Sequence, residues 1–190
     1  LIMRYKFVFI IFFVSLSMAC AQTSDNDNSR PEKWAQPVNQ LNLDNVYKID
    51  EGVYRAEQPG DKEFKELEKF GIKEVLNLRY WHSDNKEAAG TDLILHHVRM
   101  NAHDINNKDI INALRIIKNR KGPIVYHCKH GSDRTGVITA MYRIIFQNWT
   151  KEDAINEMKS GGYGFHRIYF NIPSYIQNVN IEALKKEINK

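Results

Sequence analysis

Apolar side chains recur at helical spacing in several segments of the chain. The clearest segment is residues 107–120, which starts at Asn107, a residue that suits a helix start, and ends in cations. Its apolar positions fall on one face of a helix: Ile110, Ile111, Leu114 and Ile117. The same spacing predicts further helices over residues 61–71, 135–146, 150–158 and 173–189.

Short apolar runs between these helices are typical of buried strands. Residues 45–49 and 53–56 are β-prone and flank an Asp-Glu-Gly turn, which predicts a hairpin. Further strands are expected over residues 75–79, 93–100 and 124–126, and the last is apolar enough for a central strand. Because strands alternate with helices, we expect an α/β domain in which helices flank a central, mostly parallel sheet.

The N-terminal residues have the composition of an export signal. Arg4 and Lys6 precede an apolar run from Phe7 to Val14, and small residues follow before Cys20. The run is too short to span a bilayer comfortably and a polar stretch follows it, so a permanent anchor helix is the less favoured alternative. The chain is therefore expected to divide into a signal over residues 1–21, a linker over 22–44 and a catalytic domain over 45–190.

The sequence around Cys20 also resembles the lipobox of bacterial lipoproteins, in which the cysteine becomes the lipidated first residue. The match departs from the usual pattern, because Leu16 lies one place too far upstream and Met18 stands where a small residue is common. Cleavage at Ala-Cys-Ala, which would give a soluble secreted protein, is the alternative. Both interpretations predict an exported protein, either periplasmic or held at the outer membrane or cell surface by its lipid.

The composition fits one ordinary globular domain. The chain has 190 residues, of which 43% are hydrophobic, enough to bury a core. The formal charge is +4, and loss of Arg4 and Lys6 with the signal leaves about +2. This charge is too small to indicate a nucleic-acid partner. We expect a monomer.

The two cysteines are expected to have different roles. If Cys20 is lipidated or removed, Cys128 has no disulfide partner. An unpaired thiol outside the cytoplasm is prone to oxidation, so its presence calls for a reason. The ordinary reason is a small buried side chain, but the neighbouring residues favour chemistry.

Residues 125–136, VYHCKHGSDRTG, place Cys128 and Arg134 in one loop between a predicted strand and a predicted helix. Such a loop presents backbone N–H groups and the positive end of the helix dipole to an anion. The same field favours the thiolate form of the cysteine. The spacing lets the guanidinium hold two phosphate oxygens while the sulfur faces phosphorus, and Gly131 and Gly136 supply room.

The motif HCxxxxxRTG, from His127 to Gly136, resembles the signature of the cysteine-dependent protein tyrosine phosphatase superfamily. The upstream sequence resembles its compact dual-specificity branch in residues 45–49, 53–59 and 71–79. The likeness covers roughly residues 40–180 and implies a dual-specificity phosphatase-like α/β domain.

The resemblance implies a two-step reaction that needs no metal or cofactor. Cys128 attacks phosphorus to form a phosphocysteine, Arg134 and the loop amides hold the oxygens, and water then releases phosphate. Thr135 helps to stabilise the thiolate as it leaves, and its hydroxyl can also cap the helix. His127 supports the loop, whose expected substrate-binding residues are Lys129, His130, Gly131, Ser132, Asp133, Arg134 and Gly136.

The leaving oxygen needs a proton, and the family places the aspartic acid that supplies it on a loop upstream of the cysteine. Residues 101–109 offer Asp104 and Asp109. Asp109 falls in the first helical turn, where a carboxylate ordinarily interacts with the helix dipole, so we favour Asp104. His103 and Asp109 stay as alternatives, and an aspartate in a loop can also be a plain turn residue.

The sequence leaves the substrate open among phosphorylated proteins, phosphoinositides and other small phosphate esters. Lys129 and His130 make the rim positive, and a lysine after the cysteine also occurs in phosphoinositide phosphatases of this superfamily. Asp133 disfavours a densely phosphorylated ligand. Residues 160–167 are expected to flank the site through His166 or Arg167.

Two other classes share these features. A rhodanese-like sulfurtransferase also has a cysteine in an anion-binding loop, but that loop is shorter and needs no aspartate on a second loop. A phosphate-binding module without turnover would keep Arg134 and lose the acid. The presence of both Cys128 and a candidate acid favours the phosphatase.

Overall fold

The computed structural model describes residues 30–190. The expected signal and the lipidation of Cys20 lie outside these residues. Within the described part of the chain, no helix is both long and apolar enough to cross a membrane.

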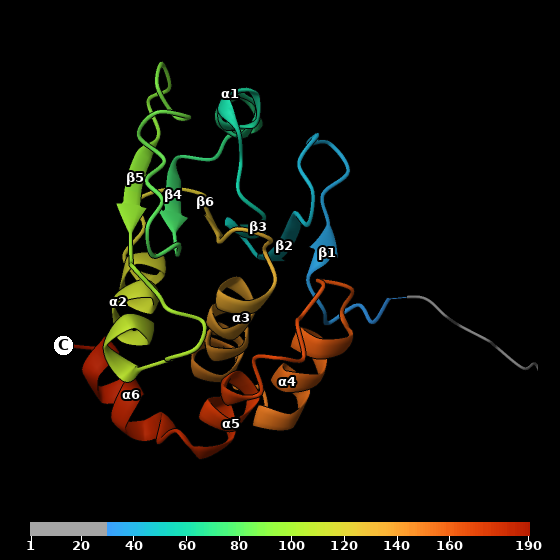
Figure 1. Ribbon diagram of the computed structural model, residues 1–190, viewed down its shortest axis with the longest axis vertical. Helices are drawn as coiled ribbons and strands as arrows, with labels where there is room; N and C mark the ends of the chain where they lie inside the picture. The colour runs from blue at the N-terminus through green and yellow to red at the C-terminus, as the bar shows by residue number, and fades with distance from the viewer. Residues whose placement is uncertain (1–29) are drawn as a thin grey trace, which may run out of the picture.

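A six-stranded mixed sheet forms the centre of the domain (Figure 1). Its strands are β1 (Gln36–Pro37), β2 (Tyr47–Asp50), β3 (Val53–Ala56), β4 (Glu74–Asn77), β5 (Ile94–His97) and β6 (Ile124–His127), in the order β1-β2-β3-β6-β4-β5. The first three strands pair antiparallel, and β3, β6, β4 and β5 pair parallel. The α/β prediction is confirmed, including the expected hairpin of β2 and β3.

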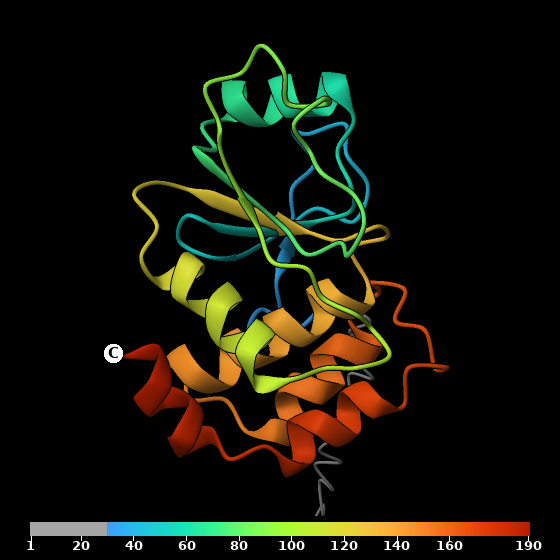
Figure 2. The same cartoon turned by 60° about the vertical axis from the view of Figure 1, so that its left-hand side comes forward.

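Helices cover the two faces of the sheet unequally. The helix α1 (Asp61–Phe70) lies alone on one face, and the remaining helices lie on the other (Figures 1 and 2). These are α2 (Asn107–Lys118), α3 (Asp133–Phe146), α4 (Lys151–Ser160), α5 (Asn171–Asn178) and α6 (Ile181–Ile188). The helix α3 is buried along most of its length, because the other helices of this layer surround it. It is therefore a rigid support for the loop at its N-terminus.

Capping residues set two helix boundaries that the periodicity does not reveal. Asn106, rather than Asn107, caps α2, because its side chain accepts a hydrogen bond from the Asp109 amide. The single helix expected over residues 173–189 is wrong. Val179 is extended, and the Asn180 side chain accepts from the Ala183 amide, so that α5 ends and α6 begins there.

The expected boundary between linker and domain at residue 45 differs from the structure. Ala35 is fully buried, and residues 36–37 form the edge strand β1 against β2. Residues 30–44 are polar in composition but pack onto the domain. A few specific contacts hold them, and no apolar run in this segment predicts the packing. Arg30, for example, donates through Nε to the Ala35 carbonyl and through Nη1 to the Gly161 carbonyl.

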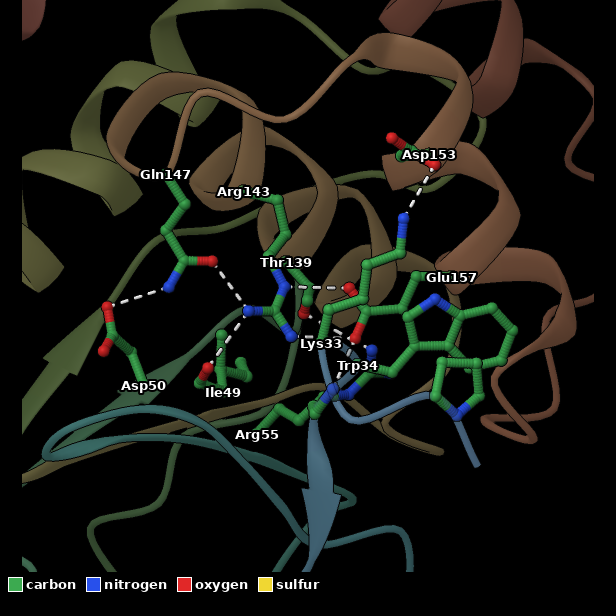
Figure 3. Close-up of polar contacts among 12 residues, drawn as sticks. Lys33, Trp34, Ile49, Asp50, Arg55, Thr139, Arg143, Gln147, Asp153 and Glu157 are labelled. Carbon is green, nitrogen blue, oxygen red and sulfur yellow. Dashed lines mark hydrogen bonds and ion pairs between the residues drawn. The ribbon is translucent and has the colours of Figure 1, made fainter. Parts of the chain in front are cut away.

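A buried ion pair joins this N-terminal segment to two helices (Figure 3). Arg143 of α3 meets Glu157 of α4 with two contacts, Nε to Oε2 at 2.8 Å and Nη2 to Oε1 at 2.9 Å. Glu157 Oε1 also accepts from the Ala35 amide at 2.6 Å. Removing one partner of such a buried pair typically costs about 3–5 kcal/mol, because the other charge is left uncompensated. The pair therefore fixes α4 against α3.

Candidate active site

The segment that carries Cys128 has the expected strand, loop and helix order. The strand β6 ends at His127, the loop covers residues 128–132, and α3 begins at Asp133. Because β6 is flanked by the parallel strands β3 and β4, the loop lies at the carboxyl edge of the sheet, where open α/β sheets usually bind ligands. The Cys128 side chain is 2% exposed. The thiol thus lies at the base of the loop and not on its rim.

The loop carbonyls are held away from the loop centre by three neighbouring donors. The Gln58 amide donates to the Lys129 carbonyl at 3.4 Å, Asn45 Nδ2 donates to the His130 carbonyl at 2.7 Å, and Arg55 donates to the Gly131 carbonyl. A peptide plane that turns its carbonyl outward turns the amide of the next residue inward. The amides of residues 129–135 donate to no other described residue. They form a cradle of free donors, the arrangement that binds an oxyanion.

Gly131 is the position where the cradle admits no side chain. Its φ is +66°, and a Cβ there would lie 2.7 Å from the Ala56 carbonyl oxygen and 2.8 Å from the Glu57 amide nitrogen. Backbone atoms cannot yield as a flexible side chain can. The glycine is therefore needed for the close contact between the loop and the end of β3.

Two polar side-chain atoms of the motif are buried without a partner in the described chain. Arg134 Nε and Thr135 Oγ1 are both inaccessible to solvent and have no hydrogen-bond partner within residues 30–190. An unpaired buried donor costs about 1–3 kcal/mol, so it calls for a ligand. A bound phosphate would satisfy Arg134. The Thr135 hydroxyl is likewise free to donate, as its expected role at the leaving thiolate requires.

Arg55 adds a buried positive charge behind the loop. It is fully buried, its guanidinium stacks 3.7 Å from the Tyr163 ring centroid, and no carboxylate in the described chain pairs with it. Burial lowers the pKa of Arg55, and the negative charges that Tyr163, Tyr126, Glu157 and then Cys128 can carry act in the opposite direction. A negative charge on Cys128 is one of the counter-charges available to this guanidinium.

A cleft of about 390 Å³ opens beside the loop. It is lined by Arg134 and by aromatic side chains of three other segments, Tyr80, Trp81, His103 and Tyr169. Trp81 is 90% exposed, although large aromatic side chains are usually covered. The cleft can receive the group that carries the phosphate, with Arg134 at its polar end.

The loop that carries Asp104 borders this cleft. Asn101 and His103 line it, and a backbone bridge between Asn101 and Asp104 shapes the turn. Asp104 itself is exposed. Asp109 is engaged elsewhere, because its Oδ2 accepts from Asn106 Nδ2 at 2.9 Å in the cap of α2. The His103 ring packs 4.9 Å from the Tyr169 ring.

Further residues expected at the site lie in different surroundings. Lys129 and His130 are exposed. Asp133 is buried and its carboxylate accepts from the backbone and ring of His166, at 2.9 Å each. Its charge is therefore directed to His166. Arg167 lines a separate cavity of about 530 Å³ between α4 and α5, so it does not flank the cleft.

His127 is fully buried, and its Nε2 lies 2.8 Å from Asp84 Oδ2. Asp84 belongs to the polar segment between β4 and β5, which the sequence analysis leaves without a role. The structure also brings in Arg79, which follows β4. Burial and then the positive charge of Arg134 lower the pKa of Arg79.

The sequence analysis misses Asn45, Arg55, Arg79 and Asp84. Arg55 carries a signal, since an arginine within a β-prone run that becomes buried requires a partner. The other three lie in turns or loops, where nothing in the local pattern marks them. Within residues 30–190 no group of three or more His, Cys, Asp or Glu side chains is arranged to hold a metal ion.

Comparison with known proteins gives consistent matches. The model of the "Tyrosine phosphatase family" matches residues 38–190. The chain is 28% identical over 160 residues to the dual specificity protein phosphatase TpbA of Pseudomonas aeruginosa, over 83% of this chain and 72% of that protein. It is 27% identical over 128 residues to the inositol diphosphatase DSP5 of Arabidopsis thaliana, over 60% and 59% of the two chains.

Solved structures agree with these sequence matches. The crystal structure of P. aeruginosa TpbA superimposes with a TM-score of 0.76 at 27% identity, over 85% of this chain and 100% of that chain. A cysteine-to-serine variant of TpbA, solved in complex with phosphotyrosine, gives the same TM-score at 26% identity, over 85% and 99% of the two chains.

Proposed function

Because the chain belongs to the tyrosine phosphatase family, and is a cysteine-dependent phosphatase by its fold and its relatives, we propose that it hydrolyses phosphotyrosine and related aryl phosphates. The observation that carries this proposal is the pair of unpartnered groups, Arg134 Nε and Thr135 Oγ1, beside the free amides of residues 129–135. The aromatic lining of the cleft and the phosphotyrosine bound by the TpbA variant support the aryl preference.

In the first step the Cys128 sulfur donates an electron pair to phosphorus, and the bond from phosphorus to the ester oxygen breaks. The amides of residues 129–135 and the Arg134 guanidinium hold the three equatorial oxygens. The leaving phenoxide takes a proton from Asp104. In the second step water attacks the phosphocysteine and gives its proton to the Asp104 carboxylate, while Thr135 stabilises the departing thiolate.

Asp104 is favoured as the acid by elimination among carboxylates near the cleft. Asp84 is buried and accepts three hydrogen bonds, Asp109 accepts from the cap residue Asn106, and Asp133 binds His166. Asp104 is exposed on the loop whose neighbours line the cleft. A loop aspartate can reach the leaving oxygen once substrate is bound, because catalytic contacts often tighten only in that complex.

Replacement of Asp104 by asparagine is expected to lower kcat for a phosphotyrosine peptide by about 10²-fold or more, because the poor leaving group then departs without a proton. The effect should shrink along a series of aryl phosphates with better leaving groups. The measurement is steady-state hydrolysis at constant pH with a chelator present. The control is Asp109→Asn, which removes a nearby carboxylate that accepts from the α2 cap residue Asn106. Equal losses across the whole series would exclude Asp104 as the acid.

A second candidate function is hydrolysis of small molecules that carry more than one phosphate group. The observation that favours it is Arg79, whose pKa is lowered by burial and then by the positive charge of Arg134, and which donates to Gln58 Oε1 at 3.1 Å. Exposed Lys129 adds positive charge to the rim. A panel that compares a phosphotyrosine peptide, a phosphoserine peptide and inositol polyphosphates by kcat/KM separates the two. Preference for the inositol compounds would replace the aryl proposal and keep the mechanism.

We further propose that the protein acts after export, in the periplasm or at the cell surface, either lipidated at Cys20 or released. The support is the cationic and apolar N-terminal segment with its small residues before Cys20. Cell fractionation with mass spectrometry of the mature N-terminus tests this. An unprocessed N-terminus in the cytoplasmic fraction would contradict export.

A further inference from the structure

The cavity of about 530 Å³ between α4 and α5 takes no part in the steps above. The two helices pack against each other, and residues 161–170 connect them (Figure 1). The cavity is lined by the end of α4, by this connecting segment and by α5. Its volume lies in the range of ligand pockets and exceeds that of the active-site cleft, which is about 390 Å³. The cavity therefore has room for more than one side chain of a bound molecule.

The cavity and the active-site cleft are neighbours that share a wall. Tyr169 lines the cleft, and the next residue, Phe170, lines the cavity. Consecutive Cα atoms are only about 3.8 Å apart, so both hollows border the same short stretch of backbone. Asn171 Nδ2 donates to the Ala102 carbonyl at 2.9 Å, which ties the start of α5 to the loop that lines the cleft. A polypeptide with a phosphorylated residue in the cleft can therefore reach the cavity with a nearby residue.

The shared wall and the cavity expose apolar side chains. Phe165, Phe170 and Pro173 supply apolar surface to the cavity. Phe170 is 79% exposed, and Ile168, two residues before it, is 69% exposed. Apolar side chains that gather in the open at a hollow are typical of an interaction site. An apolar side chain of a bound molecule can be buried against them.

Two cations line the same cavity, Lys159 and Arg167. Neither side chain forms an ion pair or a side-chain hydrogen bond with any residue between 30 and 190, and no described carboxylate lines the cavity. The dipole of α4 accounts for Lys159, which lies in the last turn of that helix, but not for Arg167, which lies in the connecting segment. Two free cations at one hollow attract a carboxylate.

We propose that this cavity is a subsite for protein substrates, which takes an acidic side chain and a neighbouring apolar side chain close to the phosphorylated residue. The inference rests on the proposed function, because the cleft has to hold the phosphorylated residue. A small aryl phosphate occupies the cleft alone, so the subsite acts only on polypeptides. It lowers KM and leaves kcat unchanged, because its contacts are remote from the bonds that react.

The test is a set of fluorescent phosphotyrosine peptides with a neutral, alanine-rich background. Each peptide carries one glutamate-leucine pair, placed in turn at successive positions on either side of the phosphotyrosine. Fluorescence anisotropy measures their binding to full-length Cys128→Ser, relative to the peptide without the pair. The best-placed pair is expected to tighten binding about tenfold, from burial of the leucine and one exposed ion pair. Hydrolysis by the wild type should show the same gain in KM.

Charge reversal separates the subsite from a general attraction. Lys159→Glu, introduced beside Cys128→Ser, should abolish the gain from the glutamate-leucine pair and create a gain from a lysine-leucine pair at the same position. Lys65→Glu is the matched control, because Lys65 is equally exposed but belongs to α1, on the other face of the sheet. It changes the net charge by the same amount and should keep the original gain. Both side chains are exposed, so neither substitution disturbs the core.

The possible results are distinct. Equal binding of all peptides would overturn the subsite, and so would a gain that survives Lys159→Glu or that disappears equally with Lys65→Glu. Wild-type hydrolysis of aryl phosphates alongside such a result would leave the proposed function intact. If the wild type hydrolyses neither aryl phosphates nor any of the peptides, the proposed function fails instead, and binding to Cys128→Ser still decides whether the cavity holds the acidic pair.

Discussion

Cys128→Ser is expected to lower kcat for an aryl phosphate by at least about 10⁴-fold, the largest effect of any single substitution. A serine hydroxyl is a far weaker acid than a thiol, so the field of amides, helix dipole and guanidinium groups that favours a thiolate cannot make it an equivalent nucleophile. No neighbouring base replaces this ionisation, because the aspartate assigned to proton transfer serves the leaving group.

The measurement is metal-free hydrolysis together with phosphate binding. The serine variant should bind inorganic phosphate about as well as the wild type, since the amide cradle and Arg134 remain. Cys20→Ser, the matched control, removes the other cysteine and should leave kcat unchanged. Turnover by the serine variant within tenfold of the wild type would remove the cysteine mechanism.

Arg134→Lys is expected to lower kcat/KM by about 10³-fold although the charge is kept. The guanidinium can donate two parallel hydrogen bonds to two phosphate oxygens, and its Nε is already buried with no partner in the described chain. An ammonium is a point charge that cannot reproduce this geometry. Transition-state stabilisation is therefore lost more than ground-state binding.

The loss should appear mainly in kcat, because the two parallel hydrogen bonds match the arrangement that the equatorial oxygens reach only in the transition state. Arg167→Lys is the control, because Arg167 lines the separate cavity between α4 and α5. A Lys variant that keeps wild-type kcat would show that Arg134 does not hold the transferring phosphoryl group.

The sequence predicts the parts of this protein that local patterns determine. Alternating apolar runs indicate the α/β class, and the helices with one clear apolar face, such as α2, begin and end close to their expected bounds. The motif from His127 to Gly136 indicates the cysteine loop without the structure, since its strand, glycines and helix lie in one continuous stretch.

The supports of the loop could not be predicted, because each is a contact between distant segments. Asn45 and Arg55 turn the carbonyls of His130 and Gly131 outward across 85 and 76 residues of sequence. The contact of Asp84 with His127 spans 43 residues. No periodicity encodes such a pair. In the sequence, a polar residue that supports the loop therefore cannot be told from any other polar residue in a turn.

The prediction of a linker is wrong over residues 30–44 for a related reason. Its polar composition is typical of solvated chain, but Arg30 donates to the Ala35 and Gly161 carbonyls, and the Ala35 amide donates to the buried Glu157. Composition averages over a segment, whereas the packing depends on one or two residues within it. The break between α5 and α6 likewise depends on the single cap Asn180.

The most direct test of the central claim is to trap the covalent intermediate. Asp104→Asn slows the attack of water on the phosphocysteine. An activated aryl phosphate carries a leaving group that departs without a proton, so Cys128 should be phosphorylated faster than the phosphocysteine is hydrolysed. After acid quench, mass spectrometry should find phosphate on the Cys128 peptide in a substantial fraction of the protein. Phosphate on another residue, or hydrolysis with a normal rate and no labelled cysteine at any time point, would contradict the account.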